Sequence, residues 1–586
     1  YQKKNYVNWA DLVFSNALQH KHDLSVRGGS EKIKYSAGFG YLDQNGVIGK
    51  SGYQRGSFRL NTDMEITDWL DAGANLSYAK SKRLITDGNF NDISTMTPFS
   101  QPFNEDGSLR KESNTGENNP LWEMENADQQ QDDEFVTAAI FANVSLTKDL
   151  SYRFSANLRS NNRNSYRYRN KLYPGSTGEG YINHWNRSSW LLDHVLNYSV
   201  PFSSDDHRMT VSLIQSADED LTKSTRADFI NSTTDLFKWD VIGDSEIEDV
   251  NRSITRERAT SYAARVQYSL LDRYLFTGSV RRDGASVFGR ENKWATFPSA
   301  ALAWRINEES FMESTKDWLD MLKLRVSYGV VGNWAIPAYR TLGLSNSYEY
   351  LFDGKLAIGY LPSSQLQNLG LKWETTGSFN TGLDFIFLNG RISSTIEFYN
   401  TKTDNLLIQR SIPSLTGYSS MWDNLGKTKS SGFEFVLNTK IIDKKDFSLN
   451  IGANFSTQKN EIVEIDGRVD QNGKPINDIE NNWFIGEPIN VRYQYVFGGI
   501  WQEDEIEELH KLSEEEQQKH FLPGDATPTA GYIKLADYNN DGKITEDDRK
   551  IFNLDPDWYA SFNLDLYYKG IDLTAEFYTV QGVQRY

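Results

Sequence analysis

Between residues 260 and 333, apolar side chains alternate with small or polar ones at a period of two. The clearest segments are 262–270, 274–281, 298–306 and 322–330. Successive side chains of a strand point to opposite faces, so each segment has one apolar and one polar face. Each segment is roughly ten residues long, the length that crosses a bilayer as a tilted strand. The pattern predicts strands of either a membrane barrel or a soluble sandwich.

Two features favour the barrel. Strands of soluble sandwiches usually run only about five or six residues. Aromatic residues also stand near the ends of the apolar faces, where the interfacial girdles of a membrane barrel belong. These aromatic residues are Tyr262, Tyr274, Trp304 and Tyr328.

The same alternation recurs along most of the chain and predicts an all-β fold of roughly eighteen antiparallel strands. The further predicted strands are 24–29, 33–42, 53–63, 70–80, 135–147, 150–160, 189–200, 208–216, 373–386, 391–400, 432–440, 446–457, 490–500, 558–568 and 571–580. Stretches without this period are predicted to be loops, at 82–133, 161–186, 217–258 and 334–370. Tight turns therefore alternate with long loops, which is typical of an outer-membrane barrel.

Two stretches predict helix. Residues 1–20 predict a short helix or an irregular lead-in. Residues 502–520 predict a helix whose narrow apolar stripe includes Ile506 and Leu509. Its other faces are charged, so we expect it to be solvated in an external loop.

Composition narrows the function classes. The 586 residues are 38% hydrophobic, and no apolar run approaches the length of a spanning helix, which excludes a helical membrane protein. A net charge of −18 disfavours nucleic acid as a partner. There is no cysteine, and hence no disulfide or thiolate metal site. The seven histidines are scattered, and no phosphate-binding loop, nucleophile elbow or dinucleotide fingerprint is present, so we expect no enzyme.

Residues 537–548 (DYNNDGKITEDD) have the spacing of a calcium-binding loop. Oxygen ligands occupy positions 1, 3 and 5, Gly542 supplies the turn at position 6, and the last ligand at position 12 is an aspartate. The predicted ligands are Asp537, Asn539, Asp541, the carbonyl of Lys543, and Asp548. The alternative is an Asn/Asp-rich turn that binds nothing. Calcium would be structural here, bracing an external loop.

Charged residues also recur on the predicted polar faces. They are Arg153, Arg159, Arg265, Arg281, Arg305, Lys323 and Arg325, followed later by Glu397, Glu434, Asp565, Asp572 and Glu576. A low-dielectric interior does not hold unpaired charges cheaply. We expect these groups to pair with each other or with an internal plug. The alternative is a hydrated lumen in which they stay solvated.

Several strings together resemble one family. They are DLSVRGGSEKIKYSAGFGYLDQNGVIGKSGYQRGSFRLN within 22–63, LDRYLFTGSVRRDGASVFGRENKWATFPSAALAWRINEESFM at 271–312, LKLRVSYGVVGN at 322–333, and GYIKLADYNNDGKITEDDR at 531–549. In this order they resemble the SusC/RagA family of TonB-dependent outer-membrane transporters of Bacteroidota. The chain departs from the family pattern after Asn333, where it continues Trp334-Ala335-Ile336-Pro337. That loop bears on specificity.

The resemblance implies a transmembrane barrel of about 22 strands with long extracellular loops and an N-terminal plug. Residues 1–22 would be a lead-in following the plug, which is not in this chain. Residues 23–586 would be the barrel, incomplete at its C-terminus. Residues 502–550 would form an extracellular loop with a helix and the calcium-type loop.

The resemblance also implies active import of oligosaccharides across the outer membrane. A SusD-like surface lipoprotein would act as a lid, the TonB–ExbB–ExbD system would supply energy, and two SusC–SusD pairs would assemble as a dimer. Loop aromatics could stack on sugar rings or pack against the lid; the candidates are Tyr166, Tyr168, Trp185 and Trp334, with Tyr173, Tyr181 and Tyr339 nearby. Oligopeptides are the alternative cargo. Two other classes stay open, a secreted glycan-binding β-sandwich protein and a passive porin.

Overall fold

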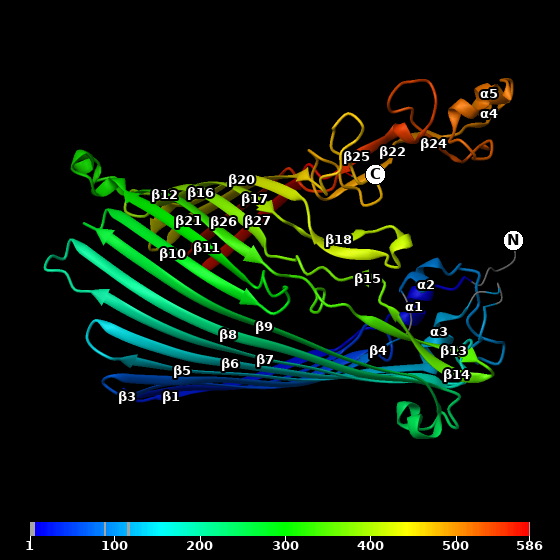
Figure 1. Cartoon of the computed structure of the whole chain (residues 1–586), viewed down its shortest axis with the longest axis horizontal. Coiled ribbons are helices and arrows are strands. Elements are labelled where there is room, and N and C mark those ends of the chain that lie inside the picture. Colours follow the sequence, from blue (N-terminus) through cyan, green and yellow to red (C-terminus); the bar gives the residue numbers. More distant parts are fainter. Residues whose placement is uncertain (1–5, 87–89, 114–115, 117, 585–586) are drawn as a thin grey trace. The chain divides into compact units, whose positions relative to one another are not determined.

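The computed structural model describes residues 6–86, 90–113, 116 and 118–584 (Figure 1). The chain divides into two compact units. Unit 1 takes in residues 1–199, 212–263 and 283–286, and unit 2 takes in residues 200–211, 264–282 and 287–586. Within the described residues, eighteen strands belong to one large sheet, and the printed pairings of its neighbours are antiparallel. The predicted number of strands and their antiparallel order are thus confirmed.

Nine strands lie wholly or mostly in unit 1. They are β1 (Gln19–Gly29), β2 (Ile33–Asn45), β3 (Gly52–Thr67), β4 (Leu70–Ile85), β5 (Ala127–Ser145), β6 (Leu150–Arg169), β7 (Glu179–Val200), β8 (His207–Ile230) and β9 (Glu246–Leu270). From β1 to β7 each strand pairs with the next one along the chain. The helical segments are α1 (Trp9–Val13), α2 (Phe90–Thr95), α3 (Pro120–Asn126) and η1 (Lys238–Asp244).

The long strands of unit 2 are β10 (Tyr274–Ala285), β11 (Trp294–Arg305), β12 (Leu319–Asn333), β16 (Glu374–Phe387), β17 (Ile392–Asp404), β20 (Lys427–Lys444), β21 (Phe447–Glu464), β26 (Trp558–Tyr568) and β27 (Ile571–Gln581). From β11 onward these strands pair in this order. The β26–β27 turn consists of Lys569 and Gly570, both with positive φ (47° and 88°), as a tight two-residue hairpin requires.

The connections of unit 2 carry short elements. The strands are β13 (Ser345–Phe352), β14 (Lys355–Pro362), β15 (Gln365–Leu366), β18 (Leu407–Ser411), β19 (Ser420–Asn424), β22 (Val491–Tyr495), β23 (Phe497–Ile500), β24 (Ile533–Leu535) and β25 (Arg549–Asn553). The helical segments are η2 (Ile306–Glu308), η3 (Ser310–Thr315), η4 (Ser414–Thr416), α4 (Glu503–Leu509), α5 (Glu514–Gln517), η5 (Gln518–His520) and η6 (Glu546–Asp548). Among the described residues, none of these helices has the length and apolar character that crossing a membrane requires.

Strand length is where the sequence prediction was wrong. Strands β5 to β9 run 19 to 25 residues, about twice the predicted ten. Much of the predicted loops 161–186 and 217–258 is therefore strand. These extensions are polar on both faces, so they carry no hydrophobic period, although their backbones continue the ladder of hydrogen bonds.

Two smaller predictions were also wrong. Residues 490–500 form no long strand, because β22 pairs with β25 and β23 pairs with β24 in separate two-stranded sheets. The helical stretch is not simply solvated, since Ile506 and Leu509 are buried against Trp501 and Phe521. The narrow stripe of this helix is the core of a small cluster within the long connection 465–557.

Candidate functional site

The strands of unit 1 separate their side chains into an apolar face and a polar face. Directly opposed residues of paired strands share a face. One such row crosses seven strands and is almost wholly apolar: Val26, Ala37, Leu60, Leu76, Ala138, Leu158 and Trp190. Leu158 keeps 56% of its surface exposed, so this face is not a core sealed between two sheets.

The apolar face has a limited height along each strand. On β6 it runs from Leu150 to Leu158, and beyond that point the same face carries Ser160 and Asn162. On the neighbouring strands it ends where Lys80 pairs with Glu134 at 2.8 Å. Nine residues span about 30 Å of strand, or roughly 23 Å when tilted by 40°. This height fits the apolar band of an outer-membrane barrel.

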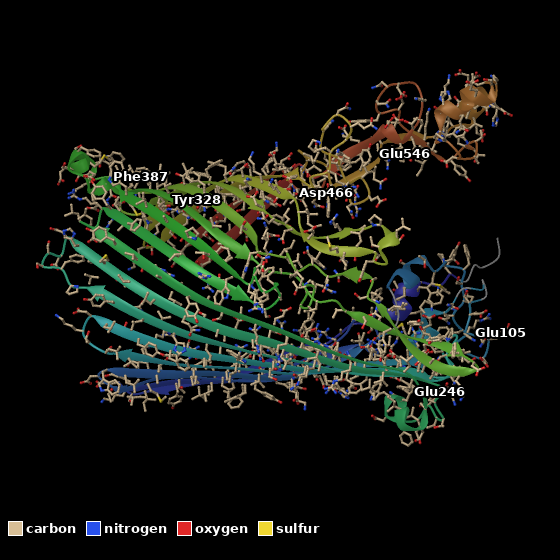
Figure 2. The ribbon with its side chains drawn as sticks, in the orientation of Figure 1. Glu105, Glu246, Tyr328, Phe387, Asp466 and Glu546 are labelled. Carbon is tan, nitrogen blue, oxygen red and sulfur yellow. The ribbon has the colours of Figure 1, made fainter. Side chains whose placement is uncertain are left out.

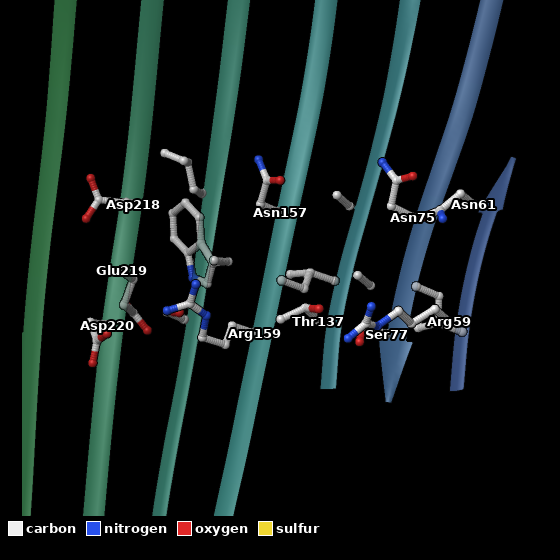
Figure 3. Close-up of a pocket in the computed structure, with 17 residues that line it drawn as sticks. Arg59, Asn61, Asn75, Ser77, Thr137, Asn157, Arg159, Asp218, Glu219 and Asp220 are labelled. Atoms are coloured by element: carbon white, nitrogen blue, oxygen red, sulfur yellow. The ribbon is translucent and has the colours of Figure 1, made fainter. Parts of the chain in front are cut away.

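The opposite face of unit 1 is polar and lines a hollow of about 750 Å³ (Figure 3). One row across β3 to β7 consists of Arg59, Ser77, Thr137, Arg159 and Ser189. The row beside it consists of Asn61, Asn75, Ala139, Asn157 and Leu191. Figure 3 shows the three asparagines in one line and the arginines with the small hydroxyl residues in the next. The hollow is thus rich in hydrogen-bond donors.

Two carboxylates at one side of the hollow accept hydrogen bonds from arginines. Asp220 accepts from Arg187 Nε at 2.8 Å, and Glu219 accepts from Arg258 Nε at 2.5 Å. Among the described residues, neither Arg59 nor Arg159 has a hydrogen-bond or ion-pair partner. Two positively charged groups of the hollow therefore make no direct hydrogen bond or ion pair with the described residues around them.

In unit 2 the polar face holds a compact charge cluster. Arg325 on β12 donates two hydrogen bonds to Asp384, at 2.8 and 3.0 Å, and lies 3.7 Å from Glu397. Gly382 on β16 lies between Arg325 on β12 and Glu397 on β17, and a Cβ at Gly382 would lie 2.7 Å from Arg325 Nη2. The glycine lets the guanidinium lie across the strand. Arg325 thus contacts two carboxylates, and a third, Glu434, faces Glu397 directly on the next strand.

The other predicted polar-face charges lie in strands with varied surroundings. Arg153 donates to Asn143 at 3.0 Å, and Arg305 lies 3.2 Å from Glu308. Arg265 lies in β9 and Arg281 in β10. Pairing within the chain thus accounts for some of these charges, whereas Arg159 and Arg265 have no hydrogen-bond or ion-pair partner among the described residues.

The predicted stacking residues lie mostly on strands rather than in loops. Tyr168 is 1% exposed, so its ring is not available to a ligand and its assignment as a stacking residue is wrong. Tyr166 stacks on Trp239, with ring centroids 5.3 Å apart, and Arg163 lies over the ring of Trp185. Trp334 is half-buried in the connection after β12. Within the described residues, intramolecular contacts already occupy three of these four rings.

Tyr168 has a structural role instead. Its hydroxyl hydrogen bonds with Ser232 Oγ and Asp235 Oδ1, both at 2.6 Å, and its ring stacks on Phe229. Burial, together with the hydrogen bond to Asp235, raises the pKa of Tyr168 to about 12. The residue ties the polar end of β6 to the connection that contains η1.

In unit 2, aromatic residues contact Glu309, which lies in the connection between β11 and β12. Tyr274 and Trp304, two of the predicted girdle residues, both donate to Glu309 Oε1, at 2.5 and 2.9 Å. The Tyr274 hydrogen bond, followed by that of Trp304, lowers the pKa of Glu309. Phe387, which is labelled in Figure 2, stacks on Trp318 with ring centroids 5.7 Å apart. Rings with anchored polar atoms are typical of a membrane interface.

The calcium-type loop is folded as a tight turn. Gly542 has φ +85°, and Asp537 accepts from the amides of Asp541 and Gly542 at 3.1 and 2.8 Å. Asp548 is fully buried and accepts from the amides of Tyr538, Asn539 and Thr545.

The donor types and the turn fit calcium, but the geometry is not that of an assembled site. Among the described residues no group of three or more His, Asp or Glu side chains is arranged to hold a metal ion. Calcium binding by these residues stays a prediction.

Sequence reasoning missed Arg59 and the three asparagines of the hollow. They lie far apart in the chain, and only strand register places Arg59 in one row with Arg159. The sequence did indicate their face, because odd-numbered positions such as 59 and 61 are on the polar side of the alternating segment 53–63. That parity indicates the face but not the neighbours on it.

Comparison with known proteins gives a consistent result. The family model "TonB dependent receptor-like, beta-barrel" matches residues 68–581. The TonB-dependent receptor P26 of Formosa agariphila is 29% identical over 600 residues, covering 99% of this chain and 58% of that protein. The TonB-dependent receptor SusC of Bacteroides thetaiotaomicron is 30% identical over 508 residues, covering 79% of this chain and 49% of that protein. The chain thus spans about half the length of these relatives.

Solved structures agree on the fold. The RagAB peptide transporter superposes with a TM-score of 0.81 at 23% identity, covering 99% of this chain and 64% of that chain. The ferric citrate transporter FecA in its unliganded form gives 0.52 at 10% identity, covering 97% of this chain and 64% of that chain.

Proposed function

Because this chain belongs to the TonB-dependent receptor-like β-barrel family of the outer membrane, we propose that it forms the barrel of a transporter that imports oligosaccharides. Membership of this family excludes the secreted β-sandwich alternative and an enzymatic role. The observation that carries the cargo proposal is the polar face of unit 1. Its rows of amide, hydroxyl and guanidinium groups line a hollow of about 750 Å³. Such groups donate and accept the hydrogen bonds that sugar hydroxyls need.

The proposal includes the machinery of a SusC–SusD-type complex. A SusD-like surface lipoprotein would cover the long-loop end, TonB with ExbB and ExbD would supply the energy, and two such pairs would associate. The SusC relative and the RagAB neighbour support this arrangement. Co-purification of the intact transporter from outer membranes, with mass spectrometry, should yield a lipoprotein in a one-to-one ratio. Recovery of the transporter alone from gently solubilised membranes would contradict the partner proposal.

Oligopeptides are the second candidate cargo. The observation that favours them is the fold similarity to the RagAB peptide transporter. A strain lacking the gene, grown on a panel of purified oligosaccharides and oligopeptides as sole carbon source, separates the two. Loss of growth on one oligosaccharide with normal growth on peptides supports the first proposal, and the reverse supports the second.

Uptake should also stop when a protonophore collapses the proton-motive force, whereas uptake through a passive porin would continue.

Calcium is a further component of the proposal. Asp537, Asn539, Asp541, Asp548 and the Lys543 carbonyl would hold the ion, and the loop sits beside the buried helical cluster, since the Ile544 amide donates to the Lys519 carbonyl at 2.7 Å. The ion would brace this connection. Calorimetric titration with calcium should give one site in the natural protein and none in Asp541→Ala. Asp547→Ala, in the same loop but outside the ligand positions, is the matched control. Absence of binding in the natural protein would end this part of the proposal.

A further inference from the structure

Arg59 and Arg159 differ from several of the arginines around them. On the polar faces of unit 1, Arg187 pairs with Asp220 and Arg163 pairs with Asp133 at 2.7 Å. Arg153 is held by Asn143. Within the described residues, Arg59 and Arg159 have no such partner, although both line the same hollow. Their charges are solvated as the chain stands, and any group that fills the hollow would remove that solvent.

The two arginines are placed to act together. They occupy one row of the sheet, separated by Ser77 and Thr137. Three strand spacings put their Cα atoms about 14 Å apart. The side chains of Ser77 and Thr137 between them are short, so both guanidinium groups can extend over these two hydroxyls. The amides of Asn61, Asn75 and Asn157 lie one row away, about 7 Å along the strands.

The chemistry of this arrangement selects an anion of low charge. A guanidinium offers a planar fork of N–H donors that matches a carboxylate in two parallel hydrogen bonds. Asp218, Glu219 and Asp220 line one side of the hollow. Glu219 and Asp220 are already paired with arginines, but the three carboxylates still oppose a highly charged anion. A single carboxylate with neighbouring hydroxyl or amide groups satisfies the arginines and the asparagines together.

We propose that Arg59 and Arg159 form a carboxylate-binding site on the lumen face of this barrel. The proposal rests on the proposed transport function, because it treats this face as the cargo-side interior. The carboxylate would come from the cargo, such as an oligosaccharide that carries a uronic acid residue.

The test uses the intact transporter purified from outer membranes, with Arg59→Gln, Arg159→Gln and the double variant. Arg252→Gln on β9 is the matched control, because it removes the same charge from an exposed strand position that does not line the hollow. The probes are a galactose trisaccharide in which one residue is replaced by galacturonate, and the neutral trisaccharide of galactose. Binding is measured by calorimetry, and plug seating is measured by ion conductance in planar bilayers without any sugar.

Each single variant should weaken binding of the singly charged trisaccharide about ten- to a hundredfold and leave conductance unchanged. Arg159→Lys should restore part of the binding, because lysine keeps the charge but loses the fork. The proposal is overturned if both single variants bind this probe as Arg252→Gln does. It is also overturned if the double variant raises conductance without any sugar and leaves binding unchanged, because the arginines would then pair with a segment of the polypeptide itself. Continued TonB-dependent uptake of a neutral oligosaccharide in that case would leave the transport function intact.

Discussion

Arg325 in unit 2 and Arg159 in unit 1 hold equivalent places, each on the polar face of a long strand, yet their surroundings differ. Arg325 lies across Gly382 and reaches Asp384 and Glu397, with 34% of its side chain exposed. Arg159 has the short residues Thr137 and Ser189 on its two sides. One arginine connects neighbouring strands through ion pairs, and the other has no ion-pair partner among the described residues. A charged residue on the polar face of a strand can therefore be paired or unpaired, and the residues beside it on neighbouring strands decide which.

The largest expected effect is on stability and comes from Arg325→Gln. This change leaves Asp384 and Glu397 without their shared cation, and we expect a loss of about 1–3 kcal/mol in the free energy of unfolding. Urea unfolding of the detergent-solubilised protein measures it. Arg159→Gln is the matched control and should change the unfolding free energy by less than about 0.5 kcal/mol. Equal losses in the two variants would remove the distinction between the arginines.

A smaller effect is expected from Tyr168→Phe, which removes a buried hydroxyl bound to Ser232 and Asp235 and should cost about 1–2 kcal/mol. The pKa of Tyr168 is raised to about 12, above its ordinary value, so its stabilising contribution is complete below pH 10 and is lost as the pH rises through 12. Hydrogen exchange at the β6–β7 end, measured between pH 10 and 12, should therefore depend on pH less steeply in the variant. An unchanged alkaline slope would argue against this assignment.

The smallest effect concerns the connection between β11 and β12, where Glu309 accepts hydrogen bonds from Tyr274 and Trp304. The pKa of Glu309 is lowered, so its contribution is present above the ordinary carboxyl pKa and declines as the pH falls through the lowered value. Glu309→Gln should shift the Trp304 fluorescence at neutral pH toward that of the natural protein in acid. Glu313→Gln, an exposed glutamate in the same connection, should leave the emission unchanged. A shift of equal size in both variants would show that the interface aromatics do not depend on Glu309.

Much of the fold followed from alternation. The positions of Leu150 and Leu158 already indicated which side of β6 is apolar, and the positions of Arg153 and Arg159 indicated which side is polar. The family resemblance rested on strings such as LKLRVSYGVVGN and proved correct. The C-terminal half of β6 was not predicted as strand, because from Ser160 and Asn162 onward the strand is polar on both faces. Tyr168 was misassigned for the same reason, since a strand residue whose ring is buried was taken for a loop aromatic.

The amino-acid sequence by itself determined which side of each strand faces lipid, because side-chain direction in a strand depends only on parity along the chain. Tertiary structure alone decided which residues of distant strands meet on the polar side, because pairing register is a property of two segments together. Arg325 found Asp384 and Glu397 through that register, and Arg59 and Arg159 were brought into one row by it. The lipid-facing surface could thus be predicted one strand at a time, whereas the site could not.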